Sequence, residues 1–350
     1  TYAVAGATST HTFTITDDDD PPTLSINDVV VTEGNAGLVN ATYTVTLSSA
    51  SGKAISVDYA TSNDSATSGA DYTAASGSLS FAAGELTKTF NVSVLGDLTD
   101  EIDETYNVTL SNPSNATILD GAGVGTITDD DLPPTLSIND VTVTEGSAGS
   151  VNATFTVSLS SASGKAISVD YATSNDSALS GADYTTASGT LSFAAGELTK
   201  TFNVSVLGDL TDEVDETFNV TLSNPSNATI NDGAGVGTIT DDDLPPTLSI
   251  NDVTVTEGNA GSVNATFTVS LSSASGKAIS VDYATSNDSA LSGADYTSTS
   301  GSLSFSAGEL TKTFNVPVLG DLVDEIDETY NVTLSNPSNA TILDGAGVGT

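Results

Sequence analysis

The sequence of 350 residues contains no cysteine, no tryptophan and no arginine, and its only histidine is His11. The absence of cysteine excludes disulfide bonds and thiolate metal sites. Without tryptophan there is no obvious stacking platform for a sugar, and His11 lies in a strand-like run, "HTFTIT", that does not support a catalytic triad. The glycine-rich "GAGVGT" at Gly121 opens no helix, so it predicts a turn and not a phosphate loop. We therefore expect no enzymatic activity.

Basic residues are scarce as well. Six lysines stand against 46 aspartates and glutamates, which gives a formal net charge of −40. This balance argues against nucleic acid as a partner and against membrane contact by these residues, because polyanions repel a polyanionic protein. The chain also lacks any run of about 20 apolar residues, the length of a membrane-spanning helix. Cations are the natural partners of such a chain.

The sequence is built as a tandem repeat. Pro22, Pro134 and Pro246 are separated by 112 residues each time, and each follows a run of aspartates. Because the chain begins and ends inside a repeat, we read it as a window on a longer protein. The predicted parts are the tail of a preceding divergent repeat at 1–20, complete repeats at 21–132 and 133–244, and a third repeat at 245–350 that stops before its final strand end and aspartate triplet.

Alternation of apolar and polar residues predicts strands throughout. In "VNATYTVTL", Val39, Ala41, Tyr43, Val45 and Leu47 fall on one face and polar residues on the other. Seven such segments in about 110 residues, without helical periodicity, indicate an all-β fold of tandem seven-stranded antiparallel immunoglobulin-like sandwiches, which we expect to form an elongated rod. The segments predicted in the first repeat are 23–32, 38–48, 54–61, 77–82, 86–95, 104–111 and 122–128.

Alternating strand directions gather the acidic residues at one end of each sandwich. If consecutive strands run up and down, eleven of the fifteen acids of the first repeat lie in loops at one pole. Two carboxylates about 6 Å apart repel by roughly 3 kcal/mol at an effective dielectric constant near 20, so such a cluster calls for a counterion. A solvated acidic surface remains the alternative for any single acid. The pole of the first repeat holds Glu33, Asp64, Asp71, Asp97, Asp100, Glu101, Asp103, Glu104, Asp129, Asp130 and Asp131.

The chemistry of the donors favours calcium. Carboxylates without histidine or cysteine select a hard cation, and a flexible set of carboxylates from several loops suits calcium better than the smaller, stricter magnesium. Each calcium takes six to eight oxygen ligands, so more than one ion per pole is plausible. We expect affinities typical of extracellular modules, on the order of 10⁻⁴ M or somewhat tighter.

Several motifs together resemble the Calx-beta domain, and the resemblance covers every full repeat. The motifs are "VTEG" at Val31, "TSNDSATSGADY" at Thr61, "GELTKTF" at Gly84, "DLTDEIDETYNVTLSN" at Asp97 and "TITDDD" at Thr126. The resemblance implies a seven-stranded sandwich that binds calcium at one end, as in the regulatory domain of the sodium/calcium exchanger. This chain departs from the exchanger at Gly96, where the exchanger has a further acidic ligand, and Asp100 is a candidate to compensate for it.

The resemblance implies a ligand set for each repeat. In the first repeat it comprises Glu33, Asp64, Asp97, Glu101, Glu104, Asp129, Asp130 and Asp131, to which we add Asp100. In the second repeat it comprises Glu145, Asp176, Asp209, Glu213, Glu216, Asp241, Asp242 and Asp243, to which we add Asp212. In the third repeat it comprises Glu257, Asp288, Asp321, Glu325 and Glu328, to which we add Asp324, and the final aspartates are missing. Residues 17–20 are the aspartates of a site whose other loops lie outside this sequence.

The function that fits these features is structural. We expect a calcium-stiffened stalk or filament of a large extracellular adhesin at the surface of a microbe, in which "DDDLPP" is both the last ligand group of one repeat and the linker to the next. Calcium ions at the joints and neighbouring repeats, including those of other copies in a filament, are the expected partners. A calcium-sensing regulatory module is the alternative. A third hypothesis is a filament in which residues 14–20 of one copy complete the third repeat of another by donated-strand pairing.

Overall fold

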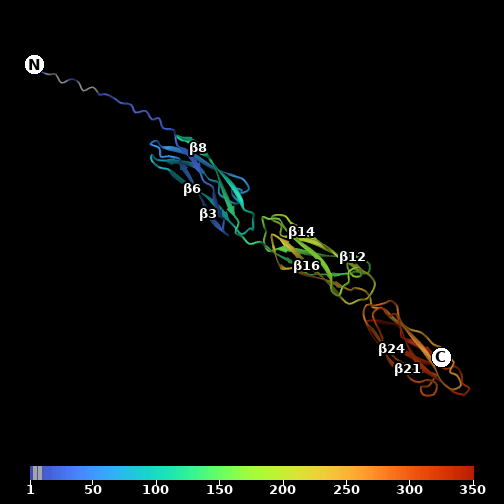
Figure 1. Ribbon diagram of the computed structural model, residues 1–350. Helices are drawn as coiled ribbons and strands as arrows, with labels where there is room; N and C mark the ends of the chain where they lie inside the picture. The colour runs from blue at the N-terminus through green and yellow to red at the C-terminus, as the bar shows by residue number, and fades with distance from the viewer. Residues whose placement is uncertain (3–5, 7–9) are drawn as a thin grey trace. The chain divides into compact units, whose positions relative to one another are not determined.

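The computed structural model describes residues 1, 2, 6 and 10–350, and within them it consists of strands and loops without a helix (Figure 1). None of the described residues therefore belongs to a helix that could cross a membrane. Contacts divide the chain into two compact units. The first is Thr1–Pro134 with Ser161–Ala166 and Ala194–Gly196, and the second is Thr135–Ser160, Ile167–Phe193 and Glu197–Thr350. Loop 161–166 thus belongs to unit 1 by its contacts, although the strands on either side of it belong to unit 2.

The first repeat is a sandwich of two sheets. The four-stranded sheet has the order β6-β3-β1-β8, and the five-stranded sheet has the order β2-β9-β7-β4-β5. The all-β sandwich predicted from the sequence is confirmed, but it contains nine strands and two parallel pairs. The strands are β1 (Thr23–Ile26), β2 (Val29–Thr32), β3 (Gly37–Leu47), β4 (Ile55–Asn63), β5 (Ser76–Phe81), β6 (Thr87–Gly96), β7 (Glu104–Ser114), β8 (Thr117–Asp120) and β9 (Ala122–Thr128).

The first predicted strand is divided between the two sheets. β1 pairs antiparallel with β3, whereas β2 pairs in parallel with β9 of the other sheet. Asn27 and Asp28, the two residues between β1 and β2, take the chain across from one sheet to the other. The Asn27 side chain accepts the Thr44 amide of one sheet at 2.6 Å, and the Asp28 side chain accepts the Val124 amide of the other at 2.8 Å. This crossing matters for function because it carries the end of β2 to the end of β9.

β8 was not predicted. It is an edge strand of four residues that pairs in parallel with β1. Asn115, with a φ of 58°, lies in the turn just before it and donates from its side chain to the Ala54 carbonyl at 2.8 Å. Asparagine tolerates this left-handed conformation better than most residues, so the turn can be made without glycine.

The core follows the predicted alternation. Ala41, Tyr43, Val45 and Leu47 of β3 are all buried between the sheets. Burying a large apolar side chain contributes about 1.5–3 kcal/mol, so a full inner face of such residues outweighs the repulsion of the acidic loops. Each of the three repeats has a hydrophobic cluster of the same kind.

The second repeat reproduces the first strand by strand, whereas the third differs at one end. The second contains β10 (Thr135–Ile138), β11 (Val141–Thr144), β12 (Gly149–Leu159), β13 (Ile167–Asn175), β14 (Ser188–Phe193), β15 (Thr199–Gly208), β16 (Glu216–Ser226), β17 (Thr229–Asp232) and β18 (Ala234–Thr240). The third contains β19 (Thr247–Ile250), β20 (Gly261–Leu271), β21 (Ile279–Asn287), β22 (Ser300–Phe305), β23 (Thr311–Gly320), β24 (Tyr330–Ser338), β25 (Thr341–Asp344) and β26 (Ala346–Gly349). Its segment equivalent to β2 is not a regular strand and pairs with β26 only through a bridge between Val253 and Gly349.

Candidate metal centre

The first carboxylate group lies where two parallel strands end together. β2 and β9 pair with Thr32 opposite Thr128, so the residues that follow the two strands emerge at the same edge of the sheet. Glu33 follows β2, and its amide donates to the Thr128 carbonyl at 3.2 Å. Asp129 and Asp131 follow β9. Glu33, Asp129 and Asp131 each offer a carboxylate oxygen, and these oxygens lie within 4.8 Å of one another.

Burial makes this group electrostatically unfavourable. Glu33 is 4% exposed, and its burial, followed by the charges of Asp97 and Glu101, raises its pKa to about 7. Burial and the neighbouring aspartates also raise the pKa of Asp131, which is 9% exposed. Asn35 donates to Asp131 Oδ1 at 2.7 Å, but Asp131 Oδ2 is buried without a hydrogen-bond partner. A cation would satisfy this oxygen and offset the repulsion.

A second carboxylate group joins the loop before β7 to the loop between β4 and β5. Asp71, Glu101 and Glu104 offer oxygens within 4.8 Å of one another. Burial raises the pKa of Glu101 and Glu104, and a hydrogen bond with Asp71 raises that of Glu104 further. Asp71 belongs to the acidic pole predicted from the sequence but not to the predicted ligand set. The hydrogen bond from the Thr67 amide to Asp71 Oδ2, at 2.5 Å, shows a turn that was not recognised in "TSGADY".

The second repeat contains both groups again. One consists of Glu145, Asp241 and Asp243, and the other of Asp183, Glu213 and Glu216. Burial, followed by the charges of Asp209 and Asp241, raises the pKa of Glu145 to about 7. Asp243 Oδ2 is buried without a partner, like its equivalent in the first repeat. The repetition shows that the geometry follows from the repeat sequence.

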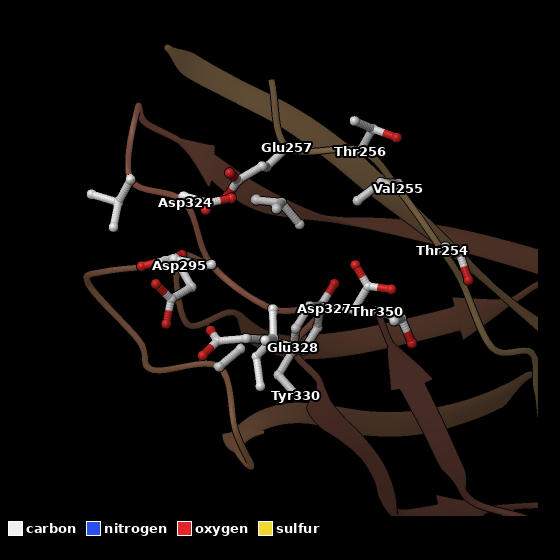
Figure 2. Close-up of a pocket in the computed structure, with 15 residues that line it drawn as sticks. Thr254, Val255, Thr256, Glu257, Asp295, Asp324, Asp327, Glu328, Tyr330 and Thr350 are labelled. Carbon is white, nitrogen blue, oxygen red and sulfur yellow. The ribbon is translucent and has the colours of Figure 1, made fainter. Parts of the chain in front are cut away.

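The third repeat retains only one group. Asp295, Glu325 and Glu328 lie together, whereas Glu257 belongs to no group of three among the described residues. A pocket of about 510 Å³ lies beside them (Figure 2), with Glu257 and Glu328 approaching it from different segments. The Val255 amide donates to the carbonyl of Thr350, the last residue, at 2.9 Å.

Three predicted ligands of the first repeat, Asp64, Asp97 and Asp130, belong to neither carboxylate group. The Asp64 carboxylate accepts the Thr105 hydroxyl at 2.7 Å, and Asp130 accepts the Gly34 amide at 3.0 Å. Asp97 accepts the Thr99 amide at 2.6 Å, and its charge acts on Glu33 and Glu101 without making it a member of either group. The equivalents with the same local bonds are Asp176, Asp209 and Asp242 in the second repeat and Asp288 and Asp321 in the third.

Asp100 has a different environment from the other acids. It is 3% exposed, and Lys165 Nζ lies 2.8 Å from its Oδ1. The same ammonium lies 3.2 Å from Asp129 Oδ2, so it touches a member of the first carboxylate group. Asp212 and Lys277 repeat the contact in unit 2, whereas Asp324 is exposed. Sequence analysis did not anticipate a lysine at the cluster, because a contact over 65 residues leaves no local signal.

Packing leaves no room for a side chain at Gly96. Gly96 is the last residue of β6, where the strand meets the turn after β2. A Cβ at Gly96 would overlap the Gly34 carbonyl oxygen and lie 2.6 Å from that of Glu33. Gly208 is equally constrained by Gly146. A side chain does not fit here, so no acidic ligand can be added without moving the turn that carries Glu33.

Comparison with known proteins agrees with this arrangement. A family model described as the Calx-beta domain matches residues 17–132, 129–243 and 241–346. The chain belongs to the Calx-beta family. Three Calx-beta domains follow one another in tandem, which confirms the resemblance seen in the sequence motifs.

The Calx-beta chain is similar to a sodium/calcium exchanger and to solved Calx domains. The sodium/calcium exchanger Calx of Drosophila melanogaster is 33% identical over 174 residues, which are 49% of this chain and 18% of the exchanger. The chain therefore spans less than a fifth of that relative. The crystal structure of CBD12 from CALX1.2 is 19% identical over 62% of this chain and 99% of that one, with a TM-score of 0.31. That of the apo-form Calx CBD1 domain is 26% identical over 32% of this chain and 100% of that one, with a TM-score of 0.28.

The donor set of both carboxylate groups fits a hard cation. All six side chains of the first repeat's groups supply carboxylate oxygens, and they come from four different loops and the first residue of β7. The buried, unpartnered Oδ2 atoms of Asp131 and Asp243 show that the protein alone leaves the first group incomplete in both complete repeats. Carboxylates on separate loops can adopt the irregular coordination that larger divalent cations accept.

Proposed function

We propose that each complete Calx-beta repeat of this chain binds calcium at its two carboxylate groups. The observation that carries the proposal is the buried Asp131 Oδ2, which lacks a partner although it lies beside Glu33 and Asp129. A bound calcium ion would supply positive charge and accept several oxygen ligands at once. Glu33, Asp129 and Asp131 would hold one ion, and Asp71, Glu101 and Glu104 another. The predicted ligands Asp97 and Asp130 lie near these residues in the sequence and would complete the coordination shells of the two ions.

We further propose that calcium serves a structural role in an extracellular stalk. The two complete repeats carry groups of the same residue types and geometry, which suits a uniform spacer. Asp131 and Asp243 lie at the start of the short linkers that end at the buried Pro134 and Pro246. Calcium bound to these aspartates would restrict the linker at its first residue.

A calcium-sensing module is the second candidate, and the 33% identity to an exchanger favours it. The two roles differ in what calcium changes. Small-angle scattering should show the maximum dimension of a stalk becoming more sharply defined as calcium is added, with equivalent sites filling over one concentration range. A sensor should instead fill its sites at distinct concentrations and bind a further protein only when calcium is present.

Melting experiments on the full chain test the metal sites. Calcium at a hundred times the dissociation constant stabilises a folded state by about 2.7 kcal/mol per site, so the melting temperature should rise by several degrees over that in chelator. Asp131→Asn with Asp243→Asn should remove the part of this gain that comes from the first group of each complete repeat, whereas the second groups keep their share. Asp120→Asn with Asp232→Asn makes the same charge change outside both groups and should keep it. An equal gain in both variants would contradict the assignment of the first group, and no gain in the unmodified chain would contradict calcium binding.

A further inference from the structure

The 163–165 loop makes a dense set of contacts with one acidic residue of unit 1. Ser163 Oγ donates to the Asp100 carbonyl at 2.9 Å and lies 3.0 Å from its Oδ2. The Gly164 amide donates to the Asp100 carbonyl at 2.9 Å, and Lys165 Nζ donates to its Oδ1 at 2.8 Å. Three consecutive residues of the loop thus contact the carbonyl oxygen and both carboxylate oxygens of Asp100. Such a set fixes the loop in one position.

Close packing accompanies these bonds. A Cβ at Gly164 would lie 2.9 Å from Glu101 Cγ, so glycine lets the loop backbone approach the residue after Asp100. Ser163 is 2% exposed and Asp100 is 3% exposed. A buried ion pair needs additional hydrogen bonds to offset the desolvation of both charges, and Ser163 provides them. The loop is therefore built to receive Asp100 and is not a chance surface contact.

The same contacts recur inside unit 2. Ser275 donates to the Asp212 carbonyl at 2.9 Å, and the Gly276 amide does the same at 2.9 Å. Lys277 Nζ lies 2.6 Å from Asp212 Oδ1 and 3.1 Å from Asp241 Oδ2. The contacting residues are separated by the same distances in sequence as those of the first set. Lys53 keeps part of the pattern, because it lies 2.9 Å from Asp17, which occupies the repeat position of Asp129.

Lys165 joins two acids with different neighbours. Asp100 belongs to no carboxylate group among the described residues, whereas Asp129 belongs to the group of Glu33 and Asp131. The Lys165 ammonium lies 2.8 Å from Asp100 Oδ1 and 3.2 Å from Asp129 Oδ2, and a lysine held between two carboxylates carries its ordinary positive charge at neutral pH. The ammonium is consequently a fixed positive charge at the edge of the proposed metal site.

We propose that the 163–165 and 275–277 loops are docking elements whose lysines compete with calcium for Asp129 and Asp241, and that Asp100 and Asp212 anchor these loops and bind no metal. The competition rests on the proposed calcium binding, whereas the anchoring does not. Without calcium, the ammonium offsets part of the repulsion in the first group. With calcium present, Lys165 repels the ion and shares Asp129 with it. The loop therefore stabilises the metal-free state and weakens metal binding.

Calcium titration and calorimetric melting of the full chain test both statements. Lys165→Met with Lys277→Met should lower the melting temperature in chelator and tighten average calcium binding roughly tenfold, since one unit charge next to a divalent ion is removed. Lys88→Met with Lys200→Met makes the same change of net charge at lysines paired with Glu85 and Glu197, and should alter neither quantity by as much. Asp100→Asn with Asp212→Asn, which conserves side-chain shape, should lower the melting temperature in chelator and leave the number of bound calcium ions unchanged.

These measurements test the competition with calcium and the anchoring by Asp100 and Asp212 separately. Calcium affinities that match between the two lysine double variants would overturn the competition. Fewer calcium ions bound after Asp100→Asn with Asp212→Asn would make these residues ligands and overturn their role as anchors. Absence of calcium binding by the unmodified chain would refute the proposed function and with it the competition, while the melting temperatures in chelator would still test the anchoring.

Discussion

At the scale of single residues, the two complete repeats act as controls for each other. Tyr43 and Tyr106 are buried in the first core, where their hydroxyls interact only with each other and neither makes a hydrogen bond of full geometry. The second repeat has Phe155 and Phe218 at these positions, and both are also buried. Because a buried, unsatisfied hydroxyl costs free energy, the first repeat carries a penalty that the second avoids.

Tyr43→Phe with Tyr106→Phe should therefore stabilise the first repeat. We expect a gain of about 1 kcal/mol in the free energy of unfolding, seen by scanning calorimetry of the full chain in chelator. Tyr72→Phe is the matched control, since the Tyr72 hydroxyl donates to Asn63 Oδ1 at 2.7 Å and its removal should cost about 1 kcal/mol. Destabilisation by the double variant would show that the two hydroxyls are satisfied in solution.

At the scale of elements, sequence periodicity predicts strands well and predicts their division between sheets poorly. The alternation around Tyr43 identifies β3, because its inner face is buried and its outer face is not. The crossing between β1 and β2 depends on long-range bonds from Asn27 and Asp28, which no local pattern reveals. β8 is too short and too exposed to carry a periodic signal.

The candidate site shows the same limit. Glu33, Asp129 and Asp131 could be predicted to meet, because strand direction alone brings the ends of β2 and β9 together. Asp71 could not be distinguished from Asp64 by strand counting, since both lie in the loop after β4 and only the turn held by Asp71 decides between them. The contact of Lys165 with Asp100 was equally out of reach, because it joins residues that the repeat pattern assigns to different copies.

The end of β6 provides a prediction about an element. Restoring a side chain at Gly96 by Gly96→Asp should not add a ligand. It should destabilise the first repeat by about 2 kcal/mol or more, because the side chain would overlap the turn that carries Glu33. Gly52→Asp serves as the control, since nothing lies within 4 Å of a Cβ there. Calorimetry in chelator and calcium titration measure both effects, and tighter calcium binding by Gly96→Asp would contradict the packing argument.

At the scale of the whole molecule, the net charge of −40 makes stability depend on which carboxyls hold protons. Glu33 and Glu145 have pKa values raised to about 7 in the folded chain, above the usual value of 4.5 that applies when it unfolds. Between these values the folded chain binds more protons than the unfolded one, so stability falls as the pH rises from about 4.5 to about 7. The loss is on the order of 3 kcal/mol for each of these buried carboxyls.

In chelator, the melting temperature should therefore be several degrees lower at pH 8 than at pH 5.5. Calcium should reverse this order, because the ion requires the deprotonated carboxylates and binds more tightly as they ionise. Glu33→Gln with Glu145→Gln should reduce the slope in chelator and raise the melting temperature at pH 8, since an uncharged amide avoids the repulsion from Asp131 and its neighbours. A smaller slope should remain, because Glu104 and Glu216 of the second groups also have pKa values raised to about 7. Asp58→Asn with Asp170→Asn changes the same number of charges on partly exposed strand residues outside both groups and should leave the slope between pH 5.5 and pH 8 intact. An unreduced slope after Glu33→Gln with Glu145→Gln would place the titrating groups outside the first carboxylate group.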